Sequence, residues 1–158
     1  MSIVRLAGPA DEAALFALLM KYKADNSAFG FQVDDARVAE HVLLGTRGQG
    51  GLHGVIDAPD KPGAFAGSIG IIFDRFWFSS DWGLGVIWLF VDPPYRPGTH
   101  YADALVAWAK EKRTAFEASA GHQIRMANSV ISETRLEPKL RYWRKHSGKM
   151  IGGIFEVL

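Results

Sequence analysis

The segment at residues 89–105, Leu-Phe-Val-Asp-Pro-Pro-Tyr-Arg-Pro-Gly-Thr-His-Tyr-Ala-Asp-Ala-Leu, constrains the fold of this chain more than any other. Its apolar start predicts a buried strand, its Pro/Gly-rich middle around Arg96 a sharp turn, and its end an amphipathic helix. A strand that turns tightly into a helix leaves the first N–H groups of the helix unpaired, and the helix dipole favours an anion beside them. The segment therefore predicts a phosphate site.

The composition limits the classes of protein to consider. The chain has 158 residues, 48% of them hydrophobic and 22% charged, which is ordinary for a single globular domain over residues 1–158. The formal net charge of +1 does not favour a general nucleic-acid-binding protein. The sequence has no cysteine, which excludes disulfides, cysteine-bound metals and a thiol nucleophile.

The chain carries no recognisable targeting or membrane signal. Residues 1–6 lack the layout of a signal peptide. No apolar run reaches the roughly 20 residues that a membrane-spanning helix needs. We therefore expect a soluble, cytoplasmic protein with no membrane partner.

Hydrophobic periodicity and turn residues predict the order of the elements. The expected strands are 3–6, 52–56, 64–73, 86–91, 123–128 and 150–157, and the expected helices are about 10–22, 34–44, 100–116 and 136–143. A hairpin early and a strand–helix–strand crossover late predict an α/β fold: a mixed, mostly antiparallel, twisted sheet of about six strands with helices on both faces. The almost continuous apolar run at 86–91 predicts a central strand.

This order and the central segment resemble the GNAT superfamily of N-acetyltransferases. The family has a Leu-x-Val-x-Pro-x-Tyr-Arg pattern before its acyl-CoA pyrophosphate loop, and the matching residues here are Leu89, Val91, Pro93, Tyr95 and Arg96. Residues 3–15 are also similar to the family's first strand and helix, and residues 140–148 to its last helix. The loop departs from the family's Arg-Gly-x-Gly-x-Gly/Ala pattern, because residues 96–102 read Arg-Pro-Gly-Thr-His-Tyr-Ala.

The resemblance implies an acyl-CoA N-acyltransferase-like fold, acetyl-CoA as cosubstrate without a metal, and direct acetyl transfer to an amine-bearing acceptor. It implies that the backbone of the strand before the loop holds the pantetheine arm, which requires the sheet to open there. Loop N–H groups and the Arg96 guanidinium would hold the pyrophosphate. The implied cofactor-binding residues are Leu89, Phe90, Val91, Arg96, Pro97, Gly98, Thr99, His100, Tyr101, Ala102 and Asn128.

Tyr142 is the candidate catalytic residue, a general acid toward the departing thiolate, by its place in the last helix; otherwise it is a tyrosine on the helix surface. Its neighbour Trp143 cannot serve as a useful acid. Since a thiol of pKa about 8.5 leaves fairly well unaided, we expect loss of Tyr142 to slow the reaction without abolishing it. No general base is assigned. The candidates, each also interpretable as an ordinary surface group, are Asp81, Glu133, His53 and His122.

Two other functions stay open at this point. One is an acyl-CoA-binding domain of the same fold without catalysis, which the altered loop and the unassigned base would suit. The other is a nucleotide-binding or interaction module. The aromatic residues between 73 and 82 permit a homodimer contact, an acceptor pocket or extra core. The acceptor is not identified, because a fold does not determine its substrate.

Overall fold

The computed structural model describes residues 2–25, 34–75, 80–128 and 136–147. The strands are β1 (Arg5–Leu6), β2 (Gly51–Asp57), β3 (Phe65–Arg75), β4 (Trp82–Val91) and β5 (Arg125–Asn128). The helices are α1 (Glu12–Asp25), α2 (Asp35–Thr46), α3 (Tyr101–Ala120) and α4 (Leu136–Ser147), and two 3₁₀ turns are η1 (Pro9–Asp11) and η2 (Pro93–Tyr95). The predicted order of strands and helices is confirmed as far as α4. The strand predicted at 150–157, which would be the sixth, lies outside the described residues.

The described strands form one mixed sheet in the order β1-β2-β3-β4-β5. The first four are antiparallel neighbours, and β5 runs parallel to β4. The chain returns from β4 to β5 through α3, because parallel neighbours need a crossover. The prediction of a mixed, mostly antiparallel sheet is therefore confirmed for this part of the chain.

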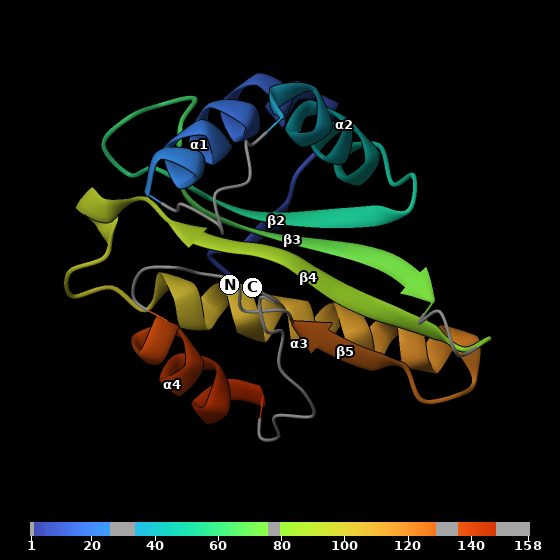
Figure 1. Ribbon diagram of the computed structural model, residues 1–158. Helices are drawn as coiled ribbons and strands as arrows, with labels where there is room; N and C mark the ends of the chain where they lie inside the picture. The colour runs from blue at the N-terminus through green and yellow to red at the C-terminus, as the bar shows by residue number, and fades with distance from the viewer. Residues whose placement is uncertain (1, 26–33, 76–79, 129–135, 148–158) are drawn as a thin grey trace, which may run out of the picture.

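The helices lie in two layers (Figure 1). α1 and α2 lie on one side of the sheet, and α3 and α4 on the other. Under α1 and α2, a core forms around Leu15, Val55 and Phe90. Under α3, a second core forms around Ile69 and Leu105. The segment from β4 through η2 into α3 thus passes from the sheet into the second helical layer.

Three glycines make room for buried rings. A Cβ on Gly54 would lie 2.7 Å from the Trp108 indole, and one on Gly70 would lie 2.5 Å from the Trp88 indole. In α2, a Cβ on Gly45 would lie only 2.0 Å from the imidazole of His53. These glycines are therefore needed for close packing rather than for a turn.

β4 starts earlier than its apolar run predicts. The sequence places Trp82 in the connection after the second hairpin strand, but Trp82 is the first residue of β4 and pairs with Arg75. The guanidinium of Arg75 also lies 4.4 Å from the centroid of the Trp82 ring. This cross-strand contact extends the hairpin by several residues beyond the predicted strand ends. The aromatic residues at 76–78 lie outside the described residues.

Candidate functional site

β4 has a bulge in its second half. β4 pairs with β3 over its length, but the register skips Ile87. The described pairing of β4 with β5 runs from Gly83 to Val86, and Val86 lies opposite Asn128, the last described residue of β5. Among the described residues, the stretch 87–91 thus has a neighbouring strand on one side only. A bulge bends and twists its strand, so β4 changes direction where its described pairing with β5 stops.

The bulge also changes which side chains of β4 face which helices. Before it, Val86 packs into the core under α3; after it, Leu89 does so, while Trp88 and Phe90 face α1 and α2. A regular strand would place Val86, Trp88 and Phe90 on the same face. The extra residue thus decides which side chains at the end of β4 face each helical layer.

The loop after β4 is held against the strand it leaves. Arg96 donates from Nε to the Val91 carbonyl at 2.7 Å, and its guanidinium lies 5.4 Å from the centroid of the Phe90 ring. Gly98 has φ +67°, a left-handed conformation that favours glycine. The predicted turn around Arg96 is therefore present, with its guanidinium held beside Phe90 and Val91 at the end of β4.

α3 begins without a side-chain cap. The Thr99 hydroxyl donates to the Tyr95 carbonyl at 2.6 Å. His100 is the N-cap residue, and its side chain makes no capping bond and is 92% exposed. Tyr101 and Ala102 lie in the first turn and pack partly on the core under α3. The first three N–H groups of a helix have no intrahelical acceptor, so this end of α3 can receive an anion.

Two contacts that the sequence does not indicate anchor the loop. Lys21 of α1 forms an ion pair with Asp92, the residue directly after β4, whose side chain is only 6% exposed. Tyr95 donates its hydroxyl to Asp60 in the turn between β2 and β3, and this bond raises the pKa of Tyr95 to about 12. For the Lys21–Asp92 pair, the sequence offers one signal, namely an acidic residue directly after a buried strand; for the Tyr95–Asp60 bond it offers none. The loop is thus tied to both helical and hairpin parts of the fold.

Tyr142 lies on α4 beside the start of α3. Its hydroxyl donates to Oδ1 of Asp103 at 3.2 Å. Burial is the main reason that the pKa of Tyr142 is raised, and the nearby Asp103 carboxylate adds to it. Trp143, the next residue, packs partly against the core under α3 instead. Of the two neighbours, Tyr142 is the one whose polar group lies at the loop end of α3.

The candidate bases do not gather at this end of the molecule. His53 is fully buried, and its Nε2 donates to the His41 carbonyl at 2.8 Å. Asp81 precedes the far end of β4, about 33 Å from the loop for a strand of this length. His122 follows α3, about 30 Å from its first turn. Glu133 lies outside the described residues.

The described part of the chain has neither a metal-ligand cluster nor a membrane-spanning helix. No group of three or more histidine, aspartate or glutamate side chains is arranged to hold a metal ion there. None of the helices in that part of the chain has both the length and the apolar character that a membrane span requires.

The fold is shared with solved acetyltransferase structures. AAC(6')-Iy in complex with the bisubstrate analogue CoA-S-monomethyl-acetylneamine aligns with a TM-score of 0.67 at 14% identity, over 98% of this chain and 95% of that one. The ribosomal-protein-alanine N-acetyltransferase of Brucella melitensis aligns with a TM-score of 0.65 at 15% identity, over 98% of each chain. An aminoglycoside acetyltransferase from an uncultured soil metagenomic sample, in complex with sisomicin, gives 0.64 at 11%, over 98% of this chain and 95% of that one.

Neither the protein-family profiles nor the curated protein sequences contain a match to this sequence. At identities of 10–18%, the structural likeness establishes the fold alone. The chain thus has the fold of GNAT-type acetyltransferases, and the resemblance inferred from residues 89–105 is confirmed at that level.

Proposed function

We propose that this chain, as a single domain over residues 1–158, is an acetyl-CoA-dependent N-acetyltransferase that moves the acetyl group directly to an amine. The observation that carries the proposal is the bulge of β4 at Ile87, followed after Val91 by a loop that ends at the uncapped start of α3. An extended acyl-pantetheine arm needs backbone partners along a strand edge, and a diphosphate needs N–H donors at its end. The fold of the acetyltransferases named above, one of them bound to a CoA analogue, supports the same function.

In this proposal the cofactor lies along the second half of β4. Backbone groups of Leu89, Phe90 and Val91 hold the pantetheine arm, and Asn128 contacts it from the end of β5. The N–H groups of residues 98–102 and the guanidinium of Arg96 receive the pyrophosphate. Pro97 offers no N–H, so it shapes the turn rather than binding. The Arg96 contact to Val91 supports this role, because it directs the side chain along the strand edge.

The chemistry is one displacement at the thioester carbonyl. The amine nitrogen attacks the carbonyl carbon, the C–S bond breaks, and the electron pair leaves on sulfur. Tyr142 gives its proton to that sulfur and is reprotonated from water, while the amine nitrogen loses one proton to water. A neutral phenol is the form an acid needs, and the raised pKa of Tyr142 keeps it neutral throughout the physiological range.

A non-catalytic acyl-CoA-binding domain is the second candidate. It is favoured by one observation, namely that none of the candidate bases in the described residues lies beside the loop. The two functions share the cofactor site and differ only in turnover.

Calorimetric titration with acetyl-CoA and a thiol-release assay test both functions. We expect saturable binding, and release of CoA thiol with at least one acceptor from a panel that includes sisomicin and a peptide with an N-terminal alanine. Binding without thiol release would favour the second candidate. Absence of binding would overturn both.

A further inference from the structure

A second set of titratable side chains surrounds the candidate acid. Asp103, in the first turn of α3, accepts a hydrogen bond from the Tyr142 hydroxyl at Oδ1. The buried Nε2 of His146 lies 3.2 Å from the same oxygen, and Nδ1 of His100 lies 3.6 Å from Oδ2. The Asp103 carboxylate thus lies next to the side chains of Tyr142 and His146 from α4 and of His100, the N-cap residue of α3.

The two α4 side chains are one helical turn apart and face Asp103 together. The rings of Tyr142 and His146 lie with centroids 4.4 Å apart, and Trp143 packs edge-on against the phenol at 5.8 Å. Lys110, two turns along α3, donates to the His146 carbonyl at 2.6 Å and holds the end of α4. The phenol ring therefore contacts two neighbouring rings of α4, and its hydroxyl has a carboxylate partner on α3.

We propose that Asp103 is a positioning residue, which orients the Tyr142 hydroxyl at the start of α3 through a charge-assisted hydrogen bond. This inference rests on the proposed function insofar as Tyr142 is the acid. The hydrogen bond holds the phenolic oxygen beside the first turn of α3. The carboxylate charge also disfavours the tyrosinate, so Tyr142 stays protonated until a thiolate competes for its proton.

A purely structural role for Asp103 makes a different prediction. An aspartate in the first turn of a helix stabilises the helix dipole whatever lies beside it. In that case, removal of the charge would lower stability slightly and leave kcat unaffected. In the positioning role, Asp103→Asn keeps a hydrogen-bond acceptor of the same shape and removes only the charge that acts on Tyr142.

The test is an ultraviolet titration of tyrosinate in the wild type, Asp103→Asn and Tyr142→Phe. The component missing from Tyr142→Phe belongs to Tyr142. We expect Tyr142 to resist ionisation most in the wild type and to titrate at lower pH in Asp103→Asn. Glu111→Gln removes the same charge from an exposed position on the same helix and should leave the titration unchanged. Asp103→Ser serves the same comparison if Asp103→Asn does not fold.

The split between kcat and KM is the second measurement. We expect kcat to fall in Asp103→Asn, with the KM for acetyl-CoA within about twofold of the wild type. An unchanged kcat in Asp103→Asn, or a Tyr142 component that titrates at the same pH in both proteins, would overturn the proposal. Because the titration needs neither cofactor nor turnover, it reports whether the Asp103 charge acts on Tyr142 even if the chain proves not to be an acetyltransferase.

Discussion

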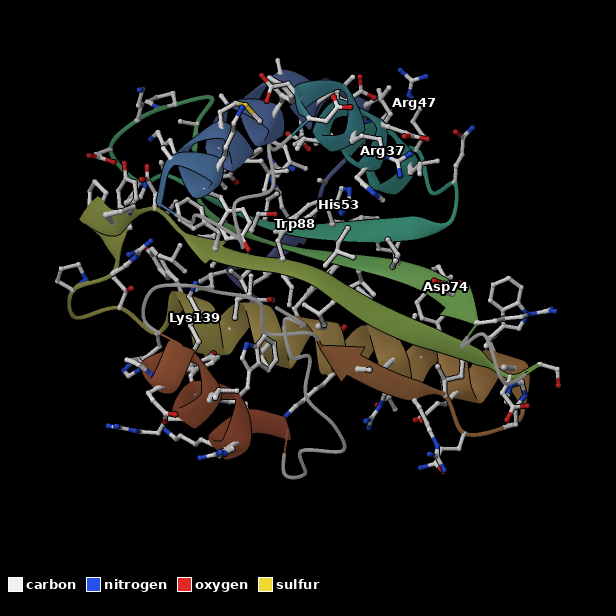
Figure 2. The ribbon with its side chains drawn as sticks, viewed as in Figure 1. Arg37, Arg47, His53, Asp74, Trp88 and Lys139 are labelled. Atoms are coloured by element: carbon white, nitrogen blue, oxygen red, sulfur yellow. The ribbon has the colours of Figure 1, made fainter. Side chains whose placement is uncertain are left out.

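The imidazole of His53 packs against the indole of Trp88, with ring centroids 4.6 Å apart. Figure 2 shows the pair between the sheet and the helices α1 and α2. Trp88 is completed by a hydrogen bond from its Nε1 to the Ser68 hydroxyl at 3.2 Å, whereas Nδ1 of His53 has no hydrogen-bond partner among the described residues. His53 is therefore a neutral core residue with one polar atom buried unpaired, which makes it a source of pH-dependent stability.

Acid should destabilise the protein through His53. Burial lowers the pKa of His53, so below pH 6.5 the unfolded chain takes up a proton that the folded chain resists. The stability from this group is complete above pH 6.5 and is lost as the pH falls through the lowered pKa. The expected slope is about 1.4 kcal/mol per pH unit, measured by urea unfolding between neutral and mildly acidic pH.

The variant His53→Gln isolates this effect. Glutamine does not titrate and can still donate to the His41 carbonyl, so the slope should become shallower. His122→Gln changes an exposed histidine near the end of α3 and should retain it. An unchanged slope in His53→Gln would assign the acid sensitivity to other groups.

Gly45→Ala should destabilise the protein although alanine is the better helix former. The new Cβ would lie 2.0 Å from the His53 ring, and the ring is enclosed on its other side by Trp88. Overpacking of this kind costs about 1–3 kcal/mol, against a gain of about 1 kcal/mol in helix propensity. Gly8→Ala, where the added Cβ meets no atom within 4 Å, is the control in the same unfolding assay. A stabilised Gly45→Ala would mean that the helix can shift away from the ring.

The ion pair between Lys21 and Asp92 should contribute more than an exposed pair. Lys21→Met leaves the Asp92 carboxylate, which is 6% exposed, without its partner. We expect the free energy of unfolding to fall by about 2 kcal/mol, less than for a fully buried pair, because the Lys21 side chain is 56% exposed. Lys23 lies on α1 like Lys21 and forms an exposed ion pair with Asp35 of α2. Lys23→Met breaks that pair and should cost at most about 1 kcal/mol of stability.

A double-mutant cycle measures the Lys21–Asp92 pair itself. The variant Lys21→Met/Asp92→Asn should lose less stability than the sum of the single changes, since no unpaired charge remains. Additive losses would indicate that the two side chains do not interact in solution.

Arg96→Lys should weaken acetyl-CoA binding about tenfold. A lysine cannot donate to the Val91 carbonyl and present a planar fork to a phosphate at the same time. Calorimetric titration gives the dissociation constant, and Arg37→Lys on α2, whose side chain is 73% exposed, is the matched control. Equal affinity in Arg96→Lys and the wild type would remove Arg96 from the proposed cofactor site.

Tyr142→Phe should lower kcat roughly tenfold and leave acetyl-CoA affinity unchanged. The reduction is smaller than general acid catalysis often provides, because a thiolate leaves readily without a proton. Steady-state kinetics together with the binding titration separate the two effects. If kcat is unaffected while binding is normal, another group or water protonates the thiolate.

The elements of the fold were largely predictable because they depend on local features. Periodic apolar residues predicted α1, α3 and the hairpin, and the Pro/Gly-rich turn after β4 predicted where α3 begins. The strand ends were less accurate. Trp82 belongs to β4 because Arg75 pairs with it across the hairpin, a contact that periodicity within one strand cannot reveal.

The candidate site was predictable only in outline. The sequence by itself determined that a buried strand leads through a tight turn at Arg96 into a helix, because apolar periodicity and turn residues act over short distances. The tertiary structure decided what that segment can do. The skipped residue Ile87 reverses the faces of β4, yet within a continuous apolar run it leaves no pattern. The contacts of Lys21 with Asp92 and of Asp103 with Tyr142 were likewise not predictable from the sequence. The two residues of each pair are 39 or more positions apart, and only folding brings such residues together.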